Sequence, residues 1–432
     1  MKRKIALLLL IAMLSLVLSG CRVEGMGTLA VYSPDGFDFE TAADKISAVY
    51  GKTVEVELLE FIGKEKTQAL LDDAEHGIFN DATWLHATGY SYLANLDFKN
   101  GVVGSEYIRD FGYNGKDTFD VSFAGDVLYD PDFSPMGHAN QKGGVLECID
   151  AEVVDYLRAS DVLLINNEFS VGTRGEPLSG KTWTFQASPE SLQIHKDLGA
   201  DIVSLANNHV YDYGKIGFYD TLAHLEEAGI PYVGAGKDLD EARQAQYFIV
   251  NGVKIGIIAA SRAEKVYFTP VATEESGGIM GTYESTDFLE AIKEADAQCD
   301  ILIVNVHWGT ENSVKLETAQ KTMAREYIDA GADAVIGGHT HCVQGMEFYN
   351  GKPIAYSIGN FWFSSYTLDS CVVTLRIDGN MNVETRFLPL IQEGCETHLL
   401  EGEERRAYLD KVEGFEPQAV RISDDGLVTP IE

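Results

Sequence analysis

Side chains capable of binding a metal follow several apolar runs of this sequence, each at the point where the run ends. Carboxylates follow the runs at 121–124 and 162–165, an amide–imidazole pair follows 202–205, and imidazoles follow 301–306 and 334–336. In chain order these donors are Asp126, Glu168, Asn208 with His209, His307, and His339 with His341. Oxygen and imidazole donors suit Mn, Fe or Zn ions that keep open positions, and they favour a two-metal cluster over one structural zinc.

Apolar runs of this kind are typical of strands in a sheet that is buried on both faces. In open α/β sheets, ligands bind beyond the carboxyl ends of the strands, so the donors are expected at one common rim. Each motif taken alone has a plainer interpretation as a turn, a helix cap or a packed histidine. Their joint occurrence at successive strand ends favours a site.

The elements around these strands indicate a layered α/β domain that gains antiparallel strands in its second half. Residues 316, 319, 323 and 327 are apolar at helical spacing. The pairs Asn251-Gly252 and Asn350-Gly351 each separate two strand-like runs and predict hairpins. Further strands are expected at 371–377 and 383–388.

Residues 26–115 are expected to form a separate small α/β module of unknown role. Strands are predicted at 29–32 and 54–58, and helices at 39–50 and 64–75. A stretch containing Gly and Asn near 112–116 is a plausible linker to the following domain.

The N-terminus has the pattern of an export signal. Basic residues at positions 2–4 precede an apolar run at 5–18, which is short against the roughly 20 residues of a membrane span. The segment ends Leu18-Ser19-Gly20-Cys21 and resembles a bacterial lipobox, so residues 1–21 are expected to be a lipoprotein signal peptide ending at a lipidated Cys21. An uncleaved signal anchor is the alternative. Both place the chain outside the cytoplasm, tethered to the cell membrane.

Composition excludes several classes of protein. Among 432 residues, 33 Lys and Arg stand against 67 Asp and Glu, a net charge of -34. Such a surface repels phosphate backbones, so no nucleic-acid partner is expected. Six cysteines do not make a disulfide scaffold. Five remain after Cys21, so at least one stays unpaired within a single chain.

The motifs together resemble those of the CapA family of bacterial poly-γ-glutamate capsule biosynthesis proteins, over residues 118–390. They are Gly125-Asp126-Val127, Asn167-Glu168, Ala206-Asn207-Asn208-His209 with Asp212 and Gly214, His307-Trp308-Gly309, Gly338-His339-Thr340-His341 and Tyr356-Ser357-Ile358-Gly359-Asn360-Phe361. That family is similar to calcineurin-like metallophosphoesterases. The resemblance implies a four-layer α/β/β/α sandwich after the small module, with residues 391–432 as an acidic C-terminal extension.

The resemblance also implies roles for individual residues. Asp126 and His341 would bind a first metal. Asn208, His307 and His339 would bind a second metal, and Glu168 would take the bridging position. His209 would be a catalytic acid held by Asp212. Leu128 stands where phosphoesterases usually have a ligand histidine, so one or two divalent ions are expected.

Two functions remain open at this stage. The first is a metal-dependent hydrolase or transferase at the cell surface, with Arg174, Lys181, Arg262 and Lys265 adding positive charge beside the rim. The second is a non-catalytic accessory protein that binds poly-γ-glutamate, a related anionic polymer or membrane-embedded capsule synthase subunits. A scaffold that binds no metal is a third, plainer alternative.

Overall fold

The computed structural model describes residues 37–50, 59, 64–75, 108–112, 114–264 and 268–431. The chain divides into two units, one of residues 1–113 with 249–252 and one of residues 114–248 with 253–432. In the first unit, helices α2 (Phe39–Tyr50) and α4 (Lys64–Glu75) occupy the two predicted helical segments and pack together. The unit also contains strand β1 (Ile108–Gly112). The strands expected at 29–32 and 54–58, the signal segment and Cys21 lie outside the described residues.

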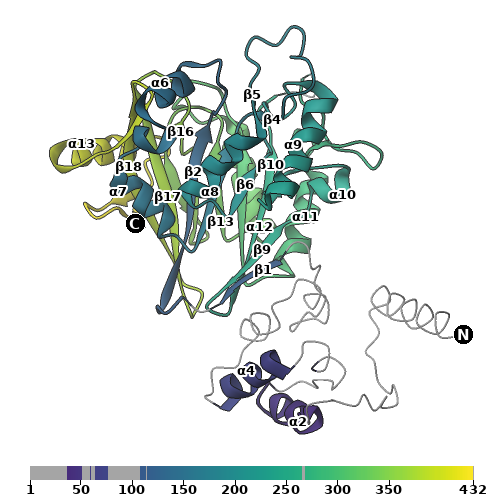
Figure 1. The fold of residues 1–432 in the computed structure, drawn as a ribbon. Helices are drawn as coiled ribbons and strands as arrows, with labels where there is room; N and C mark the ends of the chain where they lie inside the picture. Colours follow the sequence, from purple (N-terminus) through teal and green to yellow (C-terminus); the bar gives the residue numbers. More distant parts are fainter. Residues whose placement is uncertain are drawn as a thin grey trace, which may run out of the picture. The chain divides into compact units, whose positions relative to one another are not determined.

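The larger unit is built on two sheets, coloured from blue through green to yellow in Figure 1. One sheet has the order β10-β12-β13-β15-β14, and β9 lies beside β10. Its strands are β9 (Gln246–Val250), β10 (Val253–Ser261), β12 (Ile301–His307), β13 (Ala334–Gly338), β14 (Met346–Tyr349) and β15 (Lys352–Ala355). β10, β12, β13 and β15 are parallel to one another, so their carboxyl ends share an edge.

The other sheet has the order β20-β21-β18-β17-β2-β3-β6-β7, with β16 beside β2 and β19 beside β18. Its strands are β2 (Thr118–Val127), β3 (Val162–Asn167), β6 (Ile202–Ser204), β7 (Tyr232–Val233), β16 (Asn360–Trp362), β17 (Leu368–Asp378), β18 (Val383–Glu393), β19 (Glu396–Leu399), β20 (Val420–Ile422) and β21 (Leu427–Pro430). Residues 391–432, expected as a C-terminal extension, thus add β19, β20 and β21 to this sheet. Every residue of β3 and of β12 is buried, as the unbroken apolar runs predict.

Helices cover the outer faces of both sheets and complete the expected four-layer sandwich. α11 (Thr286–Asp296) and α12 (Thr318–Ala330) contact β12 and β13. α7 (Ala151–Arg158), α8 (Leu192–Leu198) and α9 (Gly214–Ala228) share a core with β3 and β6. The remaining helices are α6 (Ser134–Lys142), η3 (Val145–Cys148), η4 (Pro189–Ser191), α10 (Leu239–Ala242) and α13 (Gly402–Glu413). β2 contacts β13 across the two sheets.

Local sequence explains several of these elements. α12 begins with a capping box, in which Gln320 accepts a hydrogen bond from the Glu317 N–H at 2.9 Å. Both predicted hairpins form, and each Asn-Gly pair has positive φ angles (54° and 82°, then 52° and 79°), as a tight primed turn requires.

Two short pairs of strands complete the unit, β4 (Ser170–Val171) with β5 (Gln186–Ala187) and β8 (Ala235–Gly236) with β11 (Gly278–Ile279). The loop joining β4 to β5 stands out from the sheets in Figure 1. Over the part of the chain that the structure describes, no helix has the length and apolar character to cross a membrane. The five cysteines from Cys148 to Cys395 are unpaired there.

Candidate functional site

The strand ends bring the predicted donors together from both sheets. Asp126 lies in β2, and it pairs in register with Asn166 of β3, two residues before Glu168. On the other sheet His307 ends β12 and pairs in register with Gly338 of β13, so His339 follows directly beside it. Within each sheet, parallel register therefore places donors that are far apart in the sequence at one edge.

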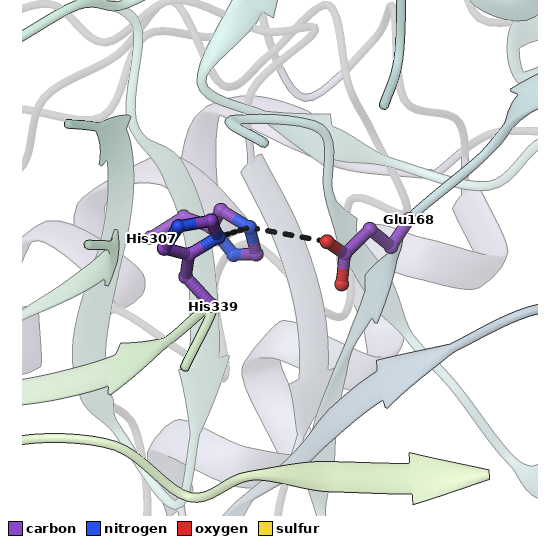
Figure 2. A group of neighbouring side chains, drawn as sticks. All are labelled: Glu168, His307 and His339. Carbon is purple, nitrogen blue, oxygen red and sulfur yellow. Dashed lines mark hydrogen bonds and ion pairs between the residues drawn. The ribbon is translucent and has the colours of Figure 1, made fainter. Parts of the chain in front are cut away.

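One group of ligands contains Glu168, His307 and His339, all buried. Figure 2 shows the two imidazoles beside each other and facing the Glu168 carboxylate. His307 Nε2 lies 3.1 Å from His339 Nδ1, 3.3 Å from Glu168 Oε1 and 2.9 Å from Asn208 Oδ1. These four residues are the ones expected around the second metal, including the bridging carboxylate.

A second group contains Asp126, Glu168 and His341. His341 Nδ1 lies 3.5 Å from Asp126 Oδ2 and 2.7 Å from Asn360 Oδ1. Within each group the ligand atoms lie within 4.8 Å of one another. Glu168 belongs to both groups, which is the geometry of a carboxylate placed between two ions. The roles of these residues as ligands stay a prediction.

The residues present fit divalent ions on two independent grounds. Ligand atoms on a coordination sphere with a radius of about 2.1 Å lie roughly 3.0 to 3.4 Å apart, close to the separations around His307 Nε2. In addition, Asp126 Oδ2 and Glu168 Oε1 are buried and accept no hydrogen bond. Buried carboxylate oxygens without a hydrogen bond are costly, and a cation between them removes that cost.

Burial and mutual charge perturb the acid–base properties of both groups. Burial lowers the pKa of His307 to about 3 and that of His339 well below 6.5. Burial, followed by the charge of Asp126, raises the pKa of Glu168 well above 4.5. For His341 burial acts to lower the pKa, but Asp126 and Asn360 outweigh it and the pKa is raised. Two neutral imidazoles are thus available as metal ligands without deprotonation.

His209 lies beside the ligands and belongs to neither group. It is buried, and its Nδ1–H donates to Asp212 Oδ2 at 2.6 Å. Burial lowers the pKa of His209, and the charge of Asp212 opposes that shift. An imidazole held by a carboxylate in this way has one defined tautomer, with its Nε2 free of the Asp212 contact.

Lys181 supports this pair from the loop between β4 and β5. Its side chain is only 6% exposed, and its ammonium lies 2.8 Å from Asp212 Oδ1 and 3.5 Å from Glu264 Oε1. It also donates to the main-chain carbonyl of Asn208. Of the three described cationic residues expected near the rim, Lys181 is the one whose side chain contacts predicted site residues.

The other three basic residues differ from that expectation or are not described. Arg174 is paired with Asp220, to which its Nε donates at 2.8 Å, and its side chain is largely exposed. Arg262 follows β10, lies over the Tyr283 ring at 4.3 Å and is 3.8 Å from the Glu317 carboxylate. Lys265 lies outside the described residues.

Sequence reasoning missed a set of asparagines that orient the ligands. Asn166 donates to Asp126 Oδ1 at 2.7 Å and to Glu168 Oε2 at 3.3 Å. Asn207 donates to Asn166 Oδ1 at 3.1 Å and accepts from the His209 N–H at 3.0 Å. The available signal was their position at strand ends, since Asn166 directly precedes the Asn167-Glu168 motif and Asn207 directly precedes the predicted ligand Asn208 within its motif.

Two backbone features shape the site. His339 and His341 have φ angles of 90° and 56°, which non-glycine residues rarely adopt and which concentrate at functional sites. Gly125 lets β16 approach β2, because a Cβ at this position would lie 1.9 Å from the Gly359 carbonyl oxygen. The close approach brings Asn360 into register with Asp126.

Leu128, where a ligand histidine is usual, is buried in the apolar core instead.

Comparison with known proteins agrees with this arrangement. The model of the family described as "Bacterial capsule synthesis protein PGA_cap" matches residues 120–365, which include all the predicted metal ligands. The chain belongs to this capsule synthesis protein family. The match ends before the last strands, although β18 to β21 complete the same sheet as β2.

Two relatives illustrate the extent of similarity. The capsule biosynthesis protein CapA of Bacillus anthracis is 32% identical over 252 residues, covering 56% of this chain and 61% of the relative. The PGA biosynthesis protein CapA of Bacillus subtilis (strain 168) is 32% identical over 269 residues, covering 61% and 69% respectively. This chain therefore spans 61% of the first relative's length, which is under two thirds, and 69% of the second's, which is slightly over two thirds.

Solved structures resemble this chain only distantly. The protein TT1561 of Thermus thermophilus gives a TM-score of 0.35 at 10% identity, covering 62% of this chain and 98% of that chain. The 5'-nucleotidase of Candida albicans gives 0.35 at 12% identity, covering 63% and 51%. The architecture described above therefore rests on the strand order and layers of this chain.

Proposed function

We propose that this protein acts in poly-γ-glutamate capsule biosynthesis or export, as a surface lipoprotein with a divalent-metal centre that supports hydrolase-type chemistry. Family membership and the names of the two CapA relatives support the capsule role. The lipobox-like segment ending at Cys21 supports an extracytoplasmic, membrane-anchored location. The observation that carries the proposed chemistry is Glu168, a buried carboxylate common to two ligand groups.

In this proposal the residues of the site have two roles, metal binding and acid catalysis. Asp126, Glu168, Asn208, His307, His339 and His341 would hold the ions. Divalent ions held there would supply Lewis-acid chemistry, polarising a substrate oxyanion and lowering the pKa of bound water. His209, oriented by Asp212 at 2.6 Å, would act as the acid by giving the leaving group a proton from its protonated imidazole.

The alternative is a binding protein that uses the same metals to capture carboxylates of the polymer without turnover. A Mycobacterium tuberculosis relative, 33% identical over 210 residues, is named probable polyglutamine synthesis accessory protein MT0602. Leu128, in place of the usual histidine, also removes one ligand from the first metal. His209 favours chemistry, because a site that only binds anions needs no imidazole held by a carboxylate next to its ligands.

Elemental analysis and turnover assays together test the proposal. The sample is the soluble chain beginning at Arg22, compared with a His339→Ala/His341→Ala double variant and with His209→Ala. One to two metal equivalents are expected in the parent and in His209→Ala, and none in the double variant. Cleavage of γ-linked glutamyl oligomers or phosphoesters by the parent, lost in His209→Ala, supports the hydrolase.

The same samples separate the two functions. Metal-dependent binding of the oligomers with no cleavage, and with no effect of His209→Ala, favours the accessory protein. If the reconstituted parent protein holds no transition metal, both versions are wrong and the motifs are architectural.

A further inference from the structure

A continuous row of aromatic rings leads from the metal-site histidines to solvent. The ring of Phe185 packs on His209 at 4.3 Å between centroids, and Phe363 packs on His341 at 4.9 Å. The two phenylalanines meet edge to face at 5.6 Å. Because one ring covers the predicted acid and the other covers a predicted ligand, this side of the site is bounded by apolar surface.

The row continues outward to the exposed ring of Trp183, and a second exposed ring, that of Tyr366, follows Phe363 in the sequence. Phe133 contacts Phe185 at 4.8 Å and Trp183 at 6.2 Å. Trp183 is 59% exposed, and Tyr366, three residues beyond Phe363, is 73% exposed. We call these five residues the aromatic wall. Exposed rings that continue a buried cluster at a site are a mark of binding surfaces.

The backbone that carries Trp183 is fixed on both sides. Lys181, two residues before it, is held by Asp212 and Glu264. Two residues after it, the Phe185 N–H donates to Asp212 Oδ2 at 2.7 Å. An exposed tryptophan on a fixed backbone loses little conformational entropy when a ligand covers it, so it is well suited to binding.

The charge around the aromatic wall determines which chemical groups of a ligand can bind to it. The net charge of -34 disfavours approach of a polyanion unless cations are bound locally. Among the described residues of the β4–β5 loop, Lys181 and Arg174 are already engaged by carboxylates. The wall therefore offers apolar contact and ring stacking, which suit the methylene and amide portions of a γ-glutamyl chain.

We propose that the aromatic wall binds the stretch of γ-glutamyl chain next to the residue held at the metal centre, with its methylene groups and amide planes against the rings. This inference rests on the proposed polymer function and deepens it by naming how the substrate is held. The metals supply the ionic attachment of one carboxylate. The wall supplies attachment that does not depend on charge.

Binding of γ-linked glutamate oligomers to the metal-loaded soluble chain tests this, measured by calorimetry at low and high salt. Trp183→Ala is expected to weaken binding about tenfold, equivalent to about 1.4 kcal/mol, by the same factor at both salt concentrations. Tyr366→Ala is expected to act in the same direction. Met381→Ala is the matched control, since Met381 is 51% exposed and lies in the β17–β18 turn. Its binding should equal that of the parent.

The outcomes separate this inference from the proposed function. If the parent binds oligomers and Trp183→Ala binds equally well, the aromatic wall is not the binding surface, while the polymer function stands. The inference also fails if Trp183→Ala loses metal, because the residue then supports the site itself. If the parent, with metal, binds no γ-glutamyl oligomer but binds a glycan through Trp183, the polymer assignment is wrong. If it binds neither, both proposals fall.

Discussion

Replacing Glu168 by glutamine separates the metal role of this residue from any structural role. The side chain is fully buried, its Oε1 accepts no hydrogen bond, and it belongs to both ligand groups. Burial and the charge of Asp126 raise its pKa well above 4.5, so in the metal-free protein an ionised Glu168 opposes folding. A neutral amide of the same shape relieves that cost. The metal-free variant should therefore be at least as stable as the parent.

With metal the order should reverse. At a metal concentration of a hundred times the parent's Kd, binding adds about 2.7 kcal/mol to the free energy of unfolding. Loss of a shared ligand should weaken affinity by at least about a hundredfold, since even residues behind the ligands contribute ten- to a hundredfold. The variant then gains only about 0.4 kcal/mol at that concentration.

Thermal unfolding with and without Mn²⁺ or Zn²⁺ measures both effects. For a unit of roughly 300 residues, these gains correspond to an increase in Tm of about 4 °C in the parent and under about 1 °C in the variant. Glu347→Gln is the control, because Glu347 is also buried but is paired with Arg325 at 3.0 Å, remote from the ligand groups. It should lower Tm equally with and without metal. An unchanged metal-induced shift in Glu168→Gln, or a clearly destabilised metal-free variant, would refute the reasoning.

Three further predictions concern residues around the site. Gly125→Ala should lower the free energy of unfolding by at least about 2 kcal/mol, because its Cβ would lie 1.9 Å from the Gly359 carbonyl oxygen; urea unfolding within error of the parent would contradict this. Burial lowers the pKa of His195 to about 3 from 6.5, so below pH 6.5 the unfolded chain binds a proton that the folded protein does not. His195 should therefore lower the free energy of unfolding by about 2 kcal/mol as the pH falls from 7.5 to 5. In urea unfolding with a chelator present, the His195→Gln variant should lack this part of the pH dependence. If the variant and the parent depend on pH identically, His195 is not the cause. Lys181→Met leaves the buried Asp212 without its cation and should cost about 3 to 5 kcal/mol in urea unfolding, with Asp212→Asn in the same chain restoring part of the loss; a neutral single variant would show that the pair contributes nothing.

Much of the fold followed from local sequence because its signals are local. The run at 301–306 is apolar throughout and becomes β12, and each Asn-Gly pair supplies the two positive φ angles of its hairpin. The two helices of the first unit, α2 and α4, also match the predicted residues. By contrast, β20 and β21 are short and joined to the sheet through β18, so their place depended on a distant partner.

The site was predictable to the extent that parallel strands align their carboxyl ends. That rule groups Asp126 with Glu168 in one sheet and His307 with His339 in the other without knowledge of any contact, but it does not predict that the two sheets bring these pairs together. It has no bearing on side chains that arrive from loops, so the packing of Phe185 on His209 and the burial of Lys181 could not be foreseen. Asn166 was missed for another reason, since an asparagine at a strand end is most simply interpreted as a turn residue.

The sharing of ligands between two sheets determines when a metal ion can be acquired. Asp126 lies in one sheet and His307 ends a strand of the other, so an unfolded or half-folded chain holds no complete group. If the proposed metals bind, loading would therefore be the last step of maturation, after the two sheets have packed. If the proposed export signal carries the chain out of the cytoplasm unfolded, the supply of metals outside the cytoplasm would select the ion. The cation found in protein produced without its export signal would then reflect the host's cytoplasm rather than the protein's native setting.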